Sequence, residues 1–110
     1  SEPARGAMSP ELIEREIAAL GAVEAALHDE RQALETRDAA ALLAATERKA
    51  AALAAAAGLT AGSGPLAGTG AAATGSPRHA ALRALVRRCR ELNEANGALI
   101  RAQRQRVEGL

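Results

Sequence analysis

The sequence contains no phenylalanine, tyrosine or tryptophan. This absence excludes aromatic platforms that stack nucleic-acid bases, aromatic cages for cations, and the aromatic anchors that dominate many tight interfaces. Any hydrophobic core must therefore be built from alanine, leucine, isoleucine and valine. Because alanine is abundant and has the highest helix propensity, the composition favours an all-α fold.

Cysteine is almost absent as well, since Cys89 is the single one in the chain. One cysteine excludes an intramolecular disulfide and a zinc site with several cysteine ligands. Cys89 falls on an apolar helical stripe, so we interpret it as a small buried residue. The alternative is a reactive thiol whose pKa is lowered by Arg88 and Arg90.

The acidic residues and histidines form no recognisable catalytic or metal-binding pattern. Glu24, Glu30, Glu35 and Asp38 fall in a helical segment, and acidic helix faces are usually exposed to solvent. We also expect His79 to be solvated in the first turn of a second helix. Because no histidine or cysteine lies at ligand spacing from another, we predict no enzyme activity, no metal site and no cofactor.

Charge is divided between the two halves of the chain. Residues 9–57 carry nine acidic and five basic side chains, a net of −4, and residues 78–110 carry three acidic and eight basic ones, a net of +5. Complementary halves are expected to pack against each other. A basic surface for nucleic acid or an anionic membrane is the alternative, but no second nucleic-acid-binding signature accompanies it.

Membrane signals are missing too. No run of about 18 apolar residues occurs, so no transmembrane helix is predicted. No charged-then-apolar leader is present either, and we therefore expect a cytoplasmic protein that neither inserts into membranes nor binds nucleic acid.

Helix signals and composition divide the chain into four segments. We interpret residues 1–8 as a tag remnant or a disordered tail. Residues 9–57 have a heptad-like apolar pattern, no proline after Pro10 and a glycine after the end, which predicts one long amphipathic helix. Residues 58–77 are uncharged and Gly/Ala-rich, which predicts a flexible linker, and residues 78–110 predict a second amphipathic helix. The expected fold is a single all-α domain, a long antiparallel helical hairpin or coiled-coil-like bundle.

The second helix carries a seam of the kind that faces another helix, with steps that alternate between four and three residues. Three amides, Asn93, Asn96 and Gln103, stand where apolar residues are expected. Buried amides in such a seam usually fix register or partner choice at a cost in stability. The seam consists of Leu82, Val86, Cys89, Asn93, Asn96, Ile100, Gln103, Val107 and Leu110.

Two blocks of this sequence resemble the FlgN family of flagellar export chaperones. The second and more specific block is a Leu-Asn-x-x-Asn-Gly-x-Leu-Ile run, here Leu92 to Ile100. Family members usually carry more helix between the blocks, where this chain has its Gly/Ala-rich segment. The first block consists of Glu30, Leu34, Arg37, Asp38, Leu42, Thr46, Lys49 and Leu53.

The resemblance implies an all-helical cytoplasmic chaperone of flagellar type III secretion. Such proteins bind the C-terminal helical regions of hook–filament junction proteins, prevent their premature association and deliver them for export. They hydrolyse no nucleotide. The resemblance also implies contact with the export gate, which we expect to require a C-terminal tail that is absent here.

A client helix in a groove is recognised by apolar anchors at helical spacing, and the second helix offers such anchors. In this reading the amides fix the register, and Gly97 allows a close backbone approach. For residues 82–96 the alternative is that the seam packs on the first helix and the asparagines set the hairpin register. The predicted client-binding residues are Leu85, Leu92, Asn93, Asn96, Gly97, Leu99, Ile100, Gln103, Val107 and Leu110.

Two other functions compete with this one. Long helices without aromatic residues bury little on their own, so a self-associating coiled-coil or helical-hairpin module is the main alternative. A nucleic-acid-binding arginine helix is the weaker one, because basic stripes are usually solvated faces. The arginines of that stripe are Arg83, Arg87, Arg90, Arg101 and Arg104.

Overall fold

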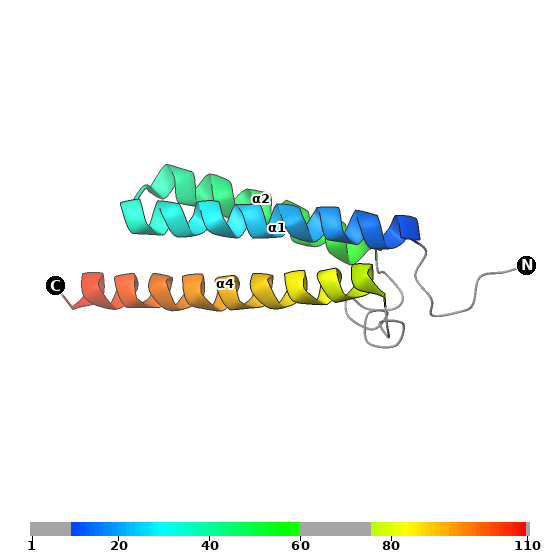
Figure 1. The fold of residues 1–110 in the computed structure, drawn as a ribbon. Helices are drawn as coiled ribbons and strands as arrows, with labels where there is room; N and C mark the ends of the chain where they lie inside the picture. Colours follow the sequence, from blue (N-terminus) through cyan, green and yellow to red (C-terminus); the bar gives the residue numbers. More distant parts are fainter. Residues whose placement is uncertain (1–9, 60–75, 110) are drawn as a thin grey trace, which may run out of the picture.

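The computed structural model describes residues 10–59 and 76–109, and within them all regular structure is α-helical (Figure 1). Helix α1 spans Pro10–Thr36, α2 spans Ala39–Leu59 and α4 spans Pro77–Glu108. The predicted all-α fold with a helical hairpin is confirmed. The predictions for residues 1–8, for Leu110 and for most of the linker lie outside the described residues. Of the predicted linker, Gly58 and Leu59 belong to α2, and Pro77 belongs to α4.

The prediction of one continuous helix over residues 9–57 is wrong, because the chain reverses at Arg37 and Asp38. Arg37 has a φ of 55°. Its N–H donates to the carbonyl of Leu34 at 3.3 Å, and the N–H of Asp38 donates to the carbonyl of Ala33 at 2.9 Å. These two bonds form a Schellman ending of α1. Asp38 then caps α2, since its Oδ1 accepts from the N–H of Ala41 at 3.0 Å.

Helix α4 begins as the sequence predicts. Ser76 is the N-cap and its Oγ accepts from the backbone N–H of His79 at 3.4 Å, while Pro77 occupies the first turn. At the other end, the N–H of Gly109 donates to the carbonyl of Gln105 at 2.9 Å. Caps at both ends satisfy backbone groups that would otherwise lack partners.

The three described helices run up, down and up, and α1 packs against both of the others (Figure 1). Ion pairs show that α4 is parallel to α1, because Arg78 pairs with Glu14 at 2.6 Å and Arg88 pairs with Glu24 at 2.8 Å. Helix α2 is therefore antiparallel to both. The hairpin turn lies between α1 and α2, whereas the sequence placed it between residues 57 and 78.

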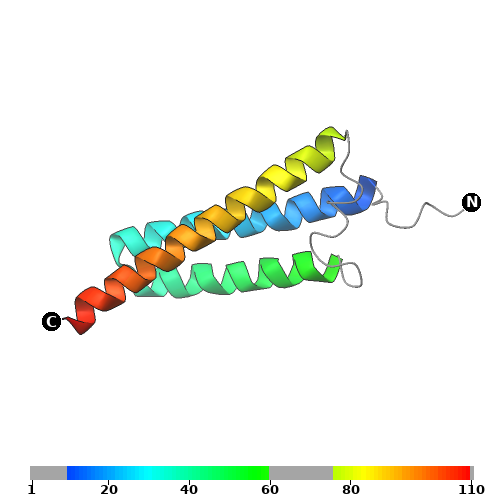
Figure 2. The ribbon, with the colours of Figure 1, turned by 90° about the horizontal axis from the view of Figure 1, so that it is seen from below.

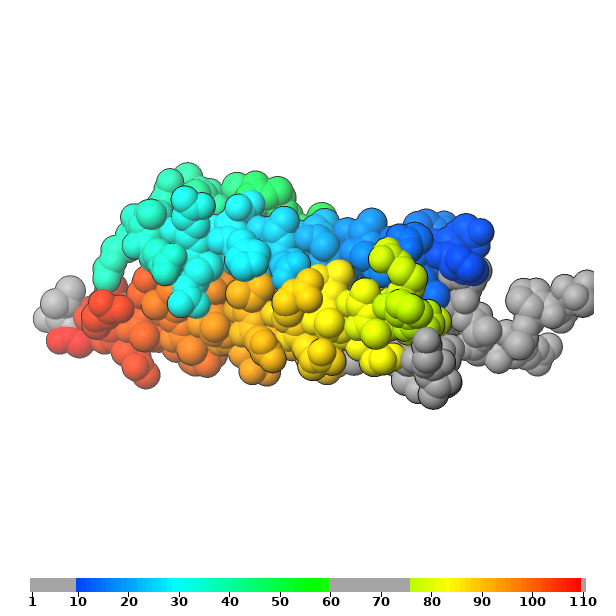
Figure 3. All heavy atoms as spheres, in the orientation of Figure 1, coloured from blue at the N-terminus to red at the C-terminus, as the bar shows by residue number. Residues whose placement is uncertain are grey.

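The core lies mainly between α1 and α4. Val23 and Leu27 from α1 pack with Leu85 and Cys89 from α4, and partly buried residues of all three helices surround them. On α2, Ala45 is fully buried, and its small side chain allows α2 to approach α1 closely. In Figure 3 the atoms of α4 lie against those of α1 along the length of the bundle.

Helix α4 crosses α1 obliquely, so α2 and α4 lie far apart at the N-terminal end of α4 (Figure 2). At its C-terminal end α4 extends past the α1–α2 turn in both views. The crossing brings the C-terminal half of α4 toward the start of α2 and leaves the bundle open between α2 and the N-terminal half of α4 (Figure 2). None of the described helices combines the length and the hydropathy needed to cross a membrane.

Candidate functional site

A polar network connects the three helices at the middle of the bundle. Its centre is the Glu30 carboxylate on α1, which is 1% exposed. From α2, Lys49 Nζ donates to both carboxylate oxygens at 2.9 and 3.2 Å, and Thr46 Oγ1 donates at 3.2 Å. From α4, Asn96 Nδ2 donates to Oε1 at 3.0 Å. Lys49 also donates to Asn93 Oδ1 at 3.1 Å, which joins α2 to α4 directly.

The network keeps Glu30 ionised. Burial raises the pKa of the Glu30 carboxyl, but hydrogen bonds from Lys49, Asn96 and Thr46, with the Lys49 charge, outweigh burial and hold the pKa below its ordinary value. The prediction that Glu30 lies on a solvent-exposed acidic face is therefore wrong. The reason is its position on α1, three residues after buried Leu27 and four before buried Leu34, which places it on the inner face.

The amides of α4 position this helix along α1. Asn96 is fully buried, and its Nδ2 also donates to the carbonyl of Leu27 at 2.9 Å. Two turns further on, Gln103 Nε2 donates to the carbonyl of Leu34 at 2.9 Å. Each bond is lost if α4 slips along α1, so the amides specify register within the chain. Asn96 Oδ1 is buried without a hydrogen-bond partner in the described part of the chain.

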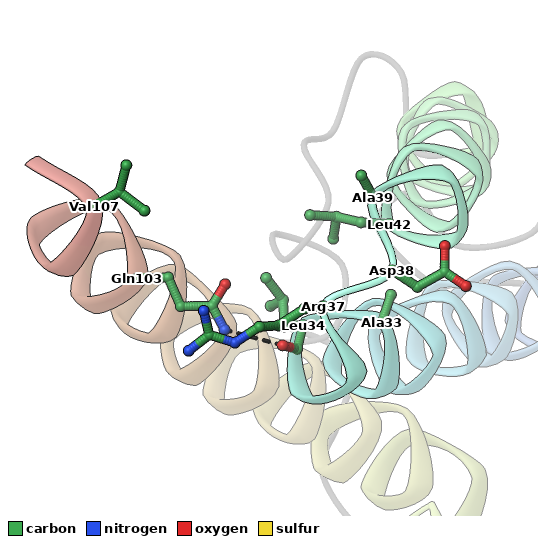
Figure 4. Close-up of a pocket in the computed structure, with 8 residues that line it drawn as sticks. All are labelled: Ala33, Leu34, Arg37, Asp38, Ala39, Leu42, Gln103 and Val107. Atoms are coloured by element: carbon green, nitrogen blue, oxygen red, sulfur yellow. Dashed lines mark hydrogen bonds between the residues drawn. The ribbon is translucent and has the colours of Figure 1, made fainter.

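Beside the network, an apolar groove lies between the start of α2 and the end of α4. The large apolar residues of its lining are Leu34 on α1, Leu42 on α2, and Ile100 and Val107 on α4. Figure 4 shows Leu42 and Val107 on separate helices, with Leu34 and Gln103 between them. The larger of its two adjoining hollows has a volume of about 500 Å³. Val107 is 65% exposed, so the described chain leaves this apolar surface uncovered.

A more polar hollow continues the groove toward the network. Lys49, Asn93, Gly97 and Arg101 line it, and Ile100 lines both this hollow and the apolar part. A Cβ added to Gly97 would meet Arg101 Nη1 at 3.4 Å, an ordinary contact. The packing of this chain therefore does not require glycine at this position, where Gly97 lines the hollow.

Several predicted client-binding residues are used inside the bundle. Leu85 is 5% exposed and Asn96 is fully buried, so the prediction that these two contact a client is wrong for the folded chain. Helix α1 covers both of them. Leu92 packs against the core, and Asn93 is exposed but bonded to Lys49. The alternative reading of residues 82–96, a seam that packs on the first helix, describes these residues better.

The C-terminal part of the predicted set lies where the groove is. Ile100, Gln103 and Val107 line its apolar part, and Gly97 lines the polar hollow. Leu99 is half-buried and lies outside these linings. Sequence reasoning missed Leu42 as a groove residue, although the sequence held a usable signal. The apolar stripe of the first segment recurs every seven residues up to Ala41 and then shifts to a stripe that begins at Leu42.

Cys89 is buried, as predicted, and its thiol lies 3.5 Å from the carbonyl of Leu20. Burial raises the pKa of the thiol and Glu24 raises it further, which outweighs the opposite effect of Arg88. The alternative of a reactive thiol with a lowered pKa is therefore wrong. His79 is 7% exposed, so the expectation that it is solvated is also wrong.

The arrangement offers apolar contacts, hydrogen bonds and ion pairs to a ligand. Across residues 10–59 and 76–109, no three His, Cys, Asp or Glu side chains gather into a group that would hold a metal ion. An open groove between two helices differs from the enclosed clefts that bind small molecules, and it suits the side chains of another helix. In comparisons with known proteins, no family model, no curated protein and no solved structure matches this chain.

Proposed function

We propose that this protein is a cytoplasmic export chaperone of flagellar type III secretion. In this proposal it binds the C-terminal helical region of a hook–filament junction protein, and a client helix lies in the groove between α2 and α4. The chaperone acts by binding alone, without catalysis. It covers the client surface that would otherwise associate early and releases the client for export.

The observation that carries the proposal is the meeting of the two sequence blocks in space. Five residues of the blocks form the polar network, and three more, Leu34, Leu42 and Ile100, line the groove beside it. The blocks on which the family resemblance rests thus build one continuous feature of the bundle. This supports a shared role for them beyond the stability of separate helices.

The geometry also favours a helix as the ligand. Helices α2 and α4 do not pack directly on each other, so an additional helix laid in the groove between them contacts both and completes a four-helix bundle. Ile100 and Val107 are seven residues apart on α4, the spacing at which a partner helix repeats its apolar face. An amphipathic helix would cover Val107, which the described chain leaves exposed.

The experiment is a calorimetric titration with the C-terminal segment of a hook–filament junction protein from the same genome. We expect saturable binding that Ile100→Ala and Val107→Ala each weaken by roughly tenfold, because each removes an apolar anchor. Leu43→Ala is the matched control, since Leu43 is 61% exposed on α2 and lies outside the groove linings. Circular dichroism shows whether each variant keeps its helicity.

Two results would contradict the proposal. The first is an absence of binding by the folded chain. The second is binding that neither groove variant weakens.

A self-associating helical module is the second candidate, favoured by the exposure of Leu43, Leu53 and Val107 at 61%, 47% and 65%. Sedimentation equilibrium distinguishes the two functions. A cooperative oligomer that Val107→Glu dissociates, together with no client binding, supports the structural module. A monomer that binds the client supports the chaperone.

A further inference from the structure

Helices α2 and α4 form two walls of the groove, yet these two described helices do not pack on each other. Each of them packs on α1 instead. Leu42 belongs to the α2 wall, and Ile100 and Val107 belong to the α4 wall. The width of the groove therefore depends on how each wall is held on α1 and on the bonds that join the walls directly.

A closed ring of hydrogen bonds joins the two walls beside the groove. Lys49 Nζ on α2 donates to the Glu30 carboxylate of α1 at 2.9 Å and to Asn93 Oδ1 of α4 at 3.1 Å. Asn96 Nδ2, on the same helix as Asn93, donates to the Glu30 carboxylate at 3.0 Å. The ring thus runs from α1 to α2, from α2 to α4, and from α4 back to α1.

The two asparagines of the ring hold α4 in different ways. Asn96 is fully buried and also donates to the carbonyl of Leu27, so it fixes one point of α4 on α1. Asn93 is exposed and accepts from α2, so it limits the rotation of α4 about that point. Because α4 crosses α1 obliquely, such a rotation changes the distance of its C-terminal half from α2 (Figure 2). Val107 lies about 16 Å from Asn96 along the helix axis, at 1.5 Å per residue, so a small rotation displaces it.

We propose that Lys49 and Asn93 are positioning residues that set the width of the groove, and that this width selects the size of the apolar side chains that a client helix presents. The inference rests on the proposed function, because it specifies which client helices the groove accepts. Gln103 bonds to the carbonyl of Leu34, so it holds α4 on α1 without fixing the distance of α4 from α2. Packed apolar contacts respond to differences of a single methylene group, so a change in width alters the preferred side chain.

The first measurement is the distance between the walls in the absence of ligand. Spin labels are attached at Ala40→Cys on α2 and Arg106→Cys on α4, two exposed positions outside the groove linings, in a Cys89→Ala background. Pulsed electron paramagnetic resonance should give a longer and broader distance distribution for Asn93→Ala than for the parent chain.

Two further variants show whether the bond to Lys49 causes this change. Asn93→Asp keeps an oxygen that accepts from Lys49, and it should restore the parent distribution. Glu94→Ala is the matched control, because Glu94 is an exposed neighbour that lines the same polar hollow. Among the described residues Glu94 forms no ion pair with another helix, so its removal should leave the distance unchanged.

The second measurement compares two synthetic helical peptides that differ only in their apolar stripe, which is leucine in one and phenylalanine in the other. In fluorescence anisotropy we expect Asn93→Ala to shift the ratio of the two affinities toward the phenylalanine peptide by about threefold, the scale of one hydrogen bond. A simple loss of folded protein lowers both apparent affinities equally, so the ratio reports the width of the groove.

An unchanged distance distribution or an unchanged affinity ratio in Asn93→Ala would overturn the inference. An equal change in Glu94→Ala, or no binding of either peptide, would overturn it as well. The junction-protein segment separates this failure from that of the proposed function. If the segment binds and Asn93→Ala changes neither the distance nor the ratio, the spacing inference fails and the chaperone proposal stands. If both change but the segment does not bind, the role of Lys49 and Asn93 in spacing the groove stands and the chaperone proposal fails.

Discussion

The ion pair between Lys49 and Glu30 is the most sensitive point of the polar network. Lys49→Met keeps most of the length and apolar volume of the side chain but removes the ammonium group. The Glu30 carboxylate then remains at 1% exposure without its cation, although Thr46 and Asn96 still donate to it. The folded state must therefore hold a buried and incompletely compensated charge.

The expected loss of stability follows from the burial of the two groups. Removing one member of a buried ion pair typically costs about 3–5 kcal/mol. The Lys49 side chain is 19% exposed, and Glu30 keeps two other donors. We therefore expect a loss of about 2–3 kcal/mol at neutral pH, or roughly 10–20 °C in the unfolding temperature.

The loss of stability in Lys49→Met should depend on pH. Because the pKa of Glu30 in the folded chain lies below its ordinary value, the network contributes fully above the unfolded pKa of about 4.3. That contribution is lost as pH falls through the folded-state pKa. The stability difference between the parent chain and Lys49→Met should therefore be largest near pH 7 and smallest near pH 3.

Urea unfolding followed by far-UV circular dichroism measures this difference at the two pH values. The double variant Glu30→Gln/Lys49→Met should recover most of the loss, because it leaves no buried charge. The glutamine oxygen can accept from Asn96, and its NH2 group can donate to the Thr46 hydroxyl. A Lys49→Met variant within about 0.5 kcal/mol of the parent would refute the reasoning. A loss of equal size at pH 3 and pH 7 would refute it as well.

Three further predictions concern other sites. Arg37→Gly should stabilise the chain by about 1 kcal/mol, because the φ of 55° at Arg37 suits glycine, and a lower urea midpoint would contradict this. Glu16 is 3% exposed, and burial raises the pKa of its carboxyl. Its charge therefore lowers the stability of the folded chain at pH values above the folded-state pKa, and this cost falls as pH drops toward 4.5. Glu16→Gln should accordingly stabilise by roughly 1 kcal/mol at pH 7 and by almost nothing at pH 4, as urea unfolding would show. Cys89 should react with a thiol-specific reagent only as fast as the bundle opens, so rapid full labelling of the native chain would contradict its burial.

The helical fold and its inner faces were accessible from the sequence, because alanine content, periodic leucines and the Ser76-Pro77 start are local signals. The reversal at Arg37 and Asp38 was not. The turn contains neither glycine nor proline, and it is held by a left-handed arginine and by the Asp38 cap. The one available signal was the shift of the apolar stripe after residue 41, which also suits a helix that drifts from a strict heptad.

Only part of the site was predicted from the sequence, and the reason is similar. Asn93 and Asn96 were recognised as unusual residues on a seam, but a sequence does not say which helix faces that seam. The structure shows that α1 covers Asn96, and that the partner of Asn93 is Lys49 on α2. Glu30 was assigned to a solvated face because carboxylates are rarely buried unless paired, and its partners come from elsewhere in the chain.

The most direct test of the proposed client site is NMR chemical-shift mapping of the isotope-labelled chain during titration with the junction-protein segment. We predict saturable changes at the backbone amides of Leu42, Lys49, Ile100 and Val107, which line the groove and its polar continuation. The amides of Leu43 and Arg87, outside these linings, should change little. Saturable changes on that outer surface with an unchanged groove, or no saturable changes at all, would contradict the account.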